Sequence, residues 1–264
     1  MKRILFFLLW ILIIKPATAQ NLPEQISINV LPFEYKMSKG TLVTGLLGVA
    51  ASPDKPLFIP EKSMVPQMNE AISAAPSQLP WVLVSSDSSA AKADYTLKGV
   101  ITKSEISTLE KNPGVHVDAS VTLVDNRTGK NVATKTCNGW SGGLDVPRDV
   151  AEAKAYAASR LTRSVVAFIL EALPITGSIL EKGVEQANGK TKEKQCYVDL
   201  GSQHGIYKDM LLYVTESGKY KAELKVIEIM ADDLCTCKVT KGDSYVTKSL
   251  EKGVELVVTS KPKN

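Results

Sequence analysis

Hydrophobic residues recur with the period of a helix in two parts of this chain. Between residues 65 and 75 they fall at Val65, Met68, Ile72 and Ala75, and Pro76 then stops the pattern. A longer stretch opens at Asp149 and stops at Pro174, with charged residues on its opposite face. We therefore expect a short amphipathic helix and a long one. The apolar positions of the long helix are Val150, Ala153, Ala157, Leu161, Val165, Phe168 and Ala172.

Other apolar segments have the character of strands. Residues 26–33 and 81–85 are short apolar runs, and residues 117–123 alternate strictly between apolar and polar side chains. Residues 95–107 and 131–137 are two further predicted strands, and a DNRTGK turn at 125–130 precedes the second of them. The expected order is β-α-β-β-β-α. Helices that cover a mostly antiparallel sheet form an α/β sandwich, so we predict an α+β fold.

The pattern changes after residue 174, where short strands alternate with turns. Asn188-Gly189 is typical of a two-residue hairpin turn. At least five strands and no helix are expected here. Closure into a small SH3-like β-barrel would hide the strand edges. We place the domain boundary between Leu173 and Pro174, which gives an α/β domain over 20–173 and a barrel over 174–264.

The first nineteen residues resemble a secretory signal peptide. Lys2 and Arg3 precede an apolar run over residues 4–14, and Ala17-Thr18-Ala19 forms a small-x-small cleavage site. The run is too short to span a bilayer, which takes about 20 residues. We expect cleavage after Ala19 and a periplasmic protein that associates with the outer membrane.

The composition of the chain narrows the classes of function that it can have. The chain has 264 residues, 44% of them hydrophobic, and a net charge of +4 from 32 basic and 28 acidic residues. This balance is ordinary for a globular protein and does not favour nucleic acid as a partner. No nucleotide-binding, serine-hydrolase or metalloprotease motif occurs, and the two histidines, His116 and His204, are isolated in the sequence. We therefore expect a protein that is not an enzyme and has no cofactor or metal.

Four cysteines are too few for a disulfide scaffold in a chain of this length. Cys235 and Cys237 would point to one face of a strand, together with an apolar residue. Buried core thiols, with one cross-strand disulfide to Cys196, are a better interpretation than a metal site, which would need further ligands.

The strongest candidate for a partner contact is the uncharged segment 42–51 (LVTGLLGVAA). It would present an apolar patch, and its glycines would let another backbone approach closely. A loop or strand pair packed in the core is an equally good interpretation. The candidate contact residues are Leu42, Val43, Gly45, Leu46, Leu47 and Gly48.

Several motifs in order resemble the CsgG family. They are DYTLKGVITK at 94–103, the strand ending in LVD at 123–125, the TGK turn at 128–130 and the Ala-rich helix that follows. The family includes the curli secretion component and LpoB-type activators of penicillin-binding proteins. The segment YVDLGSQHGI at 197–206, continued by DMLLYV at 209–214, resembles the barrel that follows such domains in FlgT-like envelope proteins.

The resemblance implies a non-enzymatic envelope protein that acts by contact with other proteins in assembling or activating an envelope machine. Its partners would be envelope proteins or further copies of itself, with a membrane surface as another contact. One alternative is a curli-type oligomeric secretion channel. The connection between Ser107 and His116 is too short and polar for the membrane hairpin that a channel needs. A second alternative is a module that binds glycan or peptidoglycan, for which Trp140 in a Gly-rich loop is the main indication.

Overall fold

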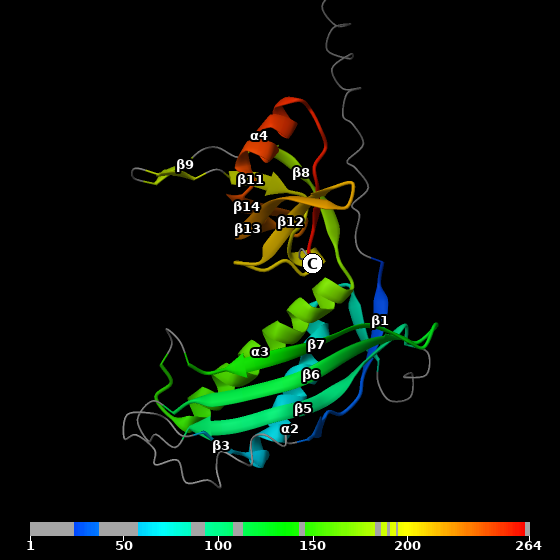
Figure 1. Cartoon of the computed structure of the whole chain (residues 1–264), viewed down its shortest axis with the longest axis vertical. Helices are drawn as coiled ribbons and strands as arrows, with labels where there is room; N and C mark the ends of the chain where they lie inside the picture. The colour runs from blue at the N-terminus through cyan, green and yellow to red at the C-terminus, as the bar shows by residue number, and fades with distance from the viewer. Residues whose placement is uncertain are drawn as a thin grey trace, which may run out of the picture.

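A mixed sheet forms the first part of the molecule (Figure 1). The computed structural model describes residues 24–36, 58–85, 93–107, 113–142, 146–182, 186–188, 191–193 and 195–261. In the sheet, β1 pairs in parallel with β4 and β5, while β5, β6 and β7 are antiparallel. The strands are β1 (Ile26–Val30), β2 (Glu34–Tyr35), β3 (Phe58–Pro60), β4 (Val82–Ser85), β5 (Tyr95–Ser107), β6 (Val115–Asp125) and β7 (Lys130–Trp140).

Two helices, α2 (Val65–Ala74) and α3 (Val150–Ala172), cover one face of this sheet (Figure 1). The alternation of β6 places Val117, Ala119 and Val121 in the core, and the apolar stripe of α3 is buried against them. Asp149 caps α3, because its Oδ1 accepts a hydrogen bond of 2.8 Å from the Glu152 N–H. Short 3-10 helices, η2 (Lys62–Met64) and η3 (Pro76–Gln78), flank α2.

Six strands close into a barrel in the second part, in the order β11-β14-β13-β12-β15-β8. Their interior side chains include Val198, Leu212, Val214, Leu224 and Val258, all fully buried. Outside the barrel are a two-stranded hairpin, β9 (Gln186–Asn188) and β10 (Thr191–Glu193), and helix α4 (Asp243–Glu251). The barrel strands are β8 (Thr176–Lys182), β11 (Gln195–Val198), β12 (Leu211–Glu216), β13 (Lys219–Ala231), β14 (Leu234–Lys241) and β15 (Val257–Thr259).

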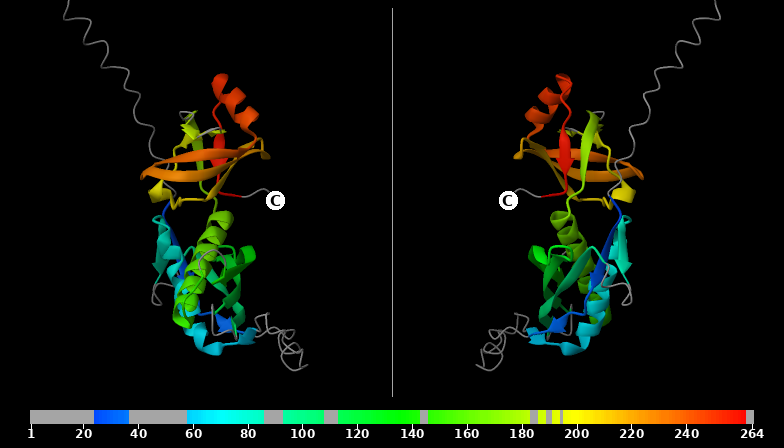
Figure 2. Two further views of the ribbon diagram at one scale, coloured as in Figure 1. Left: turned by 90° about the vertical axis from the view of Figure 1, so that its left-hand side faces the viewer. Right: turned by 90° about the vertical axis from the view of Figure 1, so that its right-hand side faces the viewer.

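Helix α3 connects the two parts. It ends at Ala172, and after three linking residues β8 begins the barrel, which lies beyond the C-terminal end of the helix (Figure 2). No helix in the described part of the chain combines the length and hydropathy that a membrane span needs.

The α+β class, the two main helices and the closed barrel agree with the sequence prediction. Three details differ. The sheet is mixed, because β1 runs parallel to both of its neighbours. Four strands separate α2 from α3, as the predicted residue ranges require, so the order β-α-β-β-β-α is one strand short; the short strands β2 and β3, which were not predicted, pair with β5. The prediction of no helix after residue 174 is wrong, since α4 packs on the barrel with Val246 buried.

Candidate functional site

The sheet face opposite the helices is open, and it has an aromatic cluster at one end. Register places Glu105, His116 and Trp140 in one row across β5, β6 and β7. The next row is Lys103, Asp118 and Asn138. Because side chains alternate across a strand, both rows project from the face that α2 and α3 leave uncovered. We call this end of the face, with Phe58 of β3, the distal surface.

Trp140 is the centre of the distal surface. Its ring is 5.5 Å from the ring of Phe58, at an interplanar angle of 48°, and 5.5 Å from the imidazole of His116, edge on. The guanidinium of Arg160 donates to the carbonyl oxygens of Trp140 and Gly142, and the indole lies over the backbone of Gly142. These contacts position the ring, yet 38% of the residue remains exposed.

The charged groups beside the ring form a chain of contacts. Lys103 Nζ lies 3.3 Å from His116 Nδ1 and 3.4 Å from Glu105 Oε2, and His116 Nε2 lies 3.1 Å from Asp118 Oδ1. An ammonium group only donates hydrogen bonds, so Nδ1 accepts and the ring proton belongs on Nε2, which donates to Asp118. The hydrogen bond from His116 lowers the pKa of the Asp118 carboxyl, against the desolvation that raises it.

Both histidines have structural partners. The two ring nitrogens of His116 contact Lys103 and Asp118, as described above. His204 is buried in η5 (Ser202–His204), where its Nδ1 accepts a 3.0 Å hydrogen bond from the Gly201 N–H. The imidazole therefore closes this turn from inside.

The structure brings together the three cysteines singled out in the sequence. Cys196 of β11 is paired in register with Cys237 of β14, and the Sγ atoms of Cys235 and Cys237 are 3.6 Å apart. All three are buried free thiols inside the barrel. The disulfide to Cys196 stays a prediction.

The other predicted contact residues cannot be compared with the distal surface. Leu42, Val43, Gly45, Leu46, Leu47 and Gly48 lie outside the described residues, as do the first nineteen residues. Sequence reasoning noticed Trp140 and His116 separately. It did not connect them with Lys103 or Phe58, although the antiparallel register of β5 and β6 places Lys103 and His116 near each other.

No family model and no curated protein sequence matches this chain. Among solved structures, the hypothetical protein CT253 from Chlamydia trachomatis is 15% identical and covers 55% of this chain and 95% of its own, with a TM-score of 0.34. The PelC dodecamer from Paraburkholderia phytofirmans is 17% identical, with coverages of 57% and 91% and a TM-score of 0.32. Lipoprotein GNA1162 from Neisseria meningitidis is 16% identical, with coverages of 55% and 97% and a TM-score of 0.32. The function is therefore argued from the residues of this chain.

Proposed function

We propose that this chain is an exported, non-enzymatic protein of the cell envelope that acts by protein–protein contact through its distal surface. The proposal combines the signal-peptide pattern of residues 1–19, the resemblance of the following motifs to the CsgG family, and the geometry around Trp140. The class of envelope machine that it would assemble or activate follows from the resemblance alone.

The observation that carries the proposal is the exposed, preorganised ring of Trp140. Tryptophan is enriched among the residues that dominate binding energy at protein interfaces. Here its ring is held by Phe58, His116 and Gly142, so little side-chain entropy would be lost on binding. The ring of Phe58 adds apolar area from β3. Lys103 and Asp118 would form the polar rim that is usual around such an anchor.

The absence of an enzymatic role is part of the proposal. His116 is a titratable group in contact with the exposed ring, and both of its nitrogens contact charged neighbours. A general base needs a free lone pair directed at its substrate. In this arrangement the lone pair on Nδ1 faces the Lys103 ammonium, so the imidazole orients Lys103 and Asp118 on the distal surface.

Cross-linking followed by an affinity measurement tests the proposal. A photoreactive amino acid at Asn138, which is exposed in the row next to Trp140, leaves the ring intact and would capture the partner in whole cells. The matched control position is Met230, which is 52% exposed on the barrel. With the captured protein purified, Trp140→Ala should weaken binding by about 30-fold, the effect of losing an interface anchor of about 2 kcal/mol. Met230→Ala should leave the affinity unchanged.

Equal effects of the two substitutions, or the same captured proteins at both positions, would place the contact elsewhere. Segment 42–51 would then be the next region to test, with Leu42, Leu46 and Leu47 changed to Ser.

Glycan binding is a second candidate, and the same ring favours it. A sugar can stack its C–H face on an indole while neighbouring polar groups bond its hydroxyls, and Asp118 and Asn138 lie in the row next to Trp140. Co-sedimentation with purified peptidoglycan distinguishes the two functions. The glycan would be the ligand if Trp140→Ala abolishes sedimentation with peptidoglycan and no protein is captured at Asn138.

A further inference from the structure

The two parts of the molecule meet beside the end of α3. Trp81 Nε1 donates a 3.2 Å hydrogen bond to the carbonyl of His204, and Ser260 Oγ donates one of 2.8 Å to the carbonyl of Leu170. Leu79 packs so closely on Gly205 that a Cβ at Gly205 would come 2.5 Å from its methyl carbon. Gly205 also has a φ of 75°, which favours glycine, so the turn after η5 is shaped for this contact.

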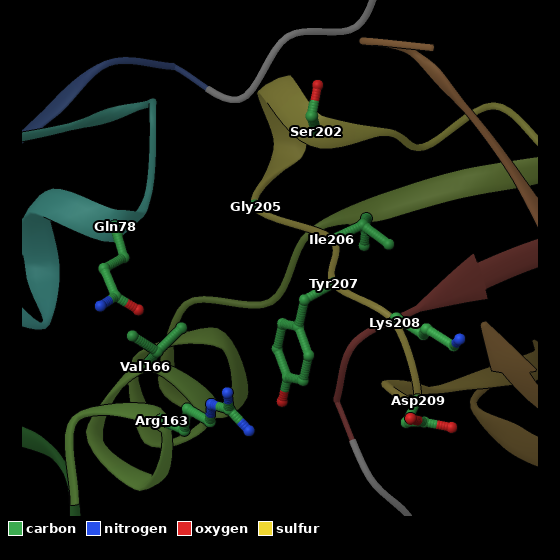
Figure 3. Close-up of a pocket in the computed structure, with 9 residues that line it drawn as sticks. All are labelled: Gln78, Arg163, Val166, Ser202, Gly205, Ile206, Tyr207, Lys208 and Asp209. Atoms are coloured by element: carbon green, nitrogen blue, oxygen red, sulfur yellow. The ribbon is translucent and has the colours of Figure 1, made fainter. Parts of the chain in front are cut away.

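A pocket of about 560 Å³ opens next to this contact (Figure 3). Gln78, Arg163 and Val166 of the sheet part form one wall, and Ile206, Tyr207 and Lys208 of the barrel part form the other. In Figure 3 the side chains of Gln78, Val166, Arg163 and Tyr207 surround a common space, while Lys208 and Asp209 extend to its outer side. The volume is within the range of small-ligand sites.

The charge balance of the pocket favours an anion. Within the described ranges, neither the Arg163 guanidinium nor the side-chain amide of Gln78 has a hydrogen bond or an ion pair. The carboxylates nearby are engaged: Asp209 pairs with Lys225 at 2.7 Å, and Asp232 accepts from Ser202 Oγ at 2.7 Å. Burial raises the pKa of Tyr207, and the nearby Glu171 raises it further, whereas Arg163 lowers it. The hydroxyl therefore keeps its proton at neutral pH and can donate a hydrogen bond.

We propose that this pocket binds a small ligand in which a carboxylate adjoins an apolar body. The planar fork of Arg163 matches a carboxylate with two parallel hydrogen bonds, and Gln78 and the Tyr207 hydroxyl can donate to the same group. Val166, Ile206 and the Tyr207 ring supply the apolar walls. Because these residues come from both parts of the molecule, the bound ligand would also hold the two parts in one orientation.

Calorimetric titration of the mature chain, residues 20–264, tests this site with N-acetyl-alanine, N-acetyl-leucine and N-acetyl-phenylalanine. Each acid is compared with its primary amide, which keeps the apolar body and lacks the charge. We expect at least one acid to bind, and its amide to bind about tenfold more weakly or not at all. If no acid binds more tightly than its amide, the proposal is wrong.

Variants locate the site. Arg163→Gln should weaken binding of the acid by about tenfold or more, and Tyr207→Phe by a smaller factor. Arg127→Gln is the matched control, since that side chain is 86% exposed in the turn between β6 and β7. Trp140→Ala should bind the acid as the parent does, which separates this pocket from the distal surface. Equal binding by the parent and Arg163→Gln would overturn the assignment.

A final titration identifies the kind of molecule that carries the carboxylate. A peptide that ends in the same residue, with a free or an amidated C-terminus, is titrated in parallel with the acids. Binding of the free-ended peptide would assign the pocket to a chain terminus, and binding of the acetylated amino acid alone would assign it to a free small molecule.

Discussion

At the scale of single residues, the four buried thiols have the most distinctive chemistry. Burial raises the pKa of Cys137 to about 11 and that of Cys196 to about 12. The contact with Cys235 and burial raise the pKa of Cys237 as well. A thiol with a pKa of about 11 is ionised in about one molecule in a thousand at pH 8, and the thiolate is the reactive form.

We expect the folded protein to react with a thiol reagent at pH 8 far more slowly than the same protein in guanidinium chloride. The measurement is absorbance with Ellman's reagent, with and without denaturant. Fast reaction of the native protein would contradict the buried positions. The number of thiols in denaturant also tests the predicted disulfide: four correspond to the free thiols of the structure, and two to a bridge that includes Cys196.

The distal surface shows which contacts can be predicted from the pattern of residues along the chain and which cannot. Alternation in β6 correctly separated His116 and Asp118 from the buried valines. It could not identify their neighbours, because Lys103, Phe58 and Trp140 come from three other strands, and their distances depend on register and on a bulge between Ile101 and Lys103. The pocket at the junction was equally inaccessible, since Arg163 is an ordinary charged residue on the polar face of α3 until the barrel packs beside it.

At the scale of elements, the packing of α3 on β7 depends on one glycine. A Cβ at Gly139 would overlap the carbonyl oxygen of Ala157 and come 3.1 Å from the Cβ of Leu161. Because the obstacle is helix backbone, α3 would have to move away from the sheet. We expect Gly139→Ala to lower the free energy of unfolding by about 2–3 kcal/mol, measured by urea denaturation.

The neighbouring position provides the control. Asn138 is exposed and its side chain lies on the opposite face of β7, so Asn138→Ala should change stability by less than about 0.5 kcal/mol. Unfolding midpoints that coincide for the two variants would show that α3 is not seated on Gly139.

Elements with a long, regular pattern could be predicted, and the others could not. Helix α3 combines an Asp149 cap, seven apolar positions in register and a proline after its end. Helix α4 lacks such signals: Gly242 at its N-cap provides no side-chain hydrogen bond, and only Val246 and Ser249 of its nine residues are buried. The two-residue strand β2 forms only through its pairing with β5. Strand β1 is parallel to β4 because the connection between them crosses over through α2.

At the scale of the whole molecule, the open question is whether the distal surface meets another protein or a second copy of this chain. Obligate oligomers bury large, strongly apolar interfaces, whereas transient partners use smaller and more polar ones. Around Trp140 the surface includes the charged groups Lys103 and Asp118 and the imidazole of His116. This mixture favours a transient partner.

We therefore expect mature residues 20–264 to be a monomer in light scattering, with the same mass in the presence and absence of mild detergent. A curli-type channel would instead give a large, discrete ring or require detergent, because its subunits share a membrane-inserted barrel. If a ring appears, Trp140→Ala decides what the distal surface does. Loss of the ring in this variant would make the second copy the partner of that surface. A ring that persists in this variant would make segment 42–51 the next candidate for the contact between subunits, and Trp140 would remain available to bind a different protein.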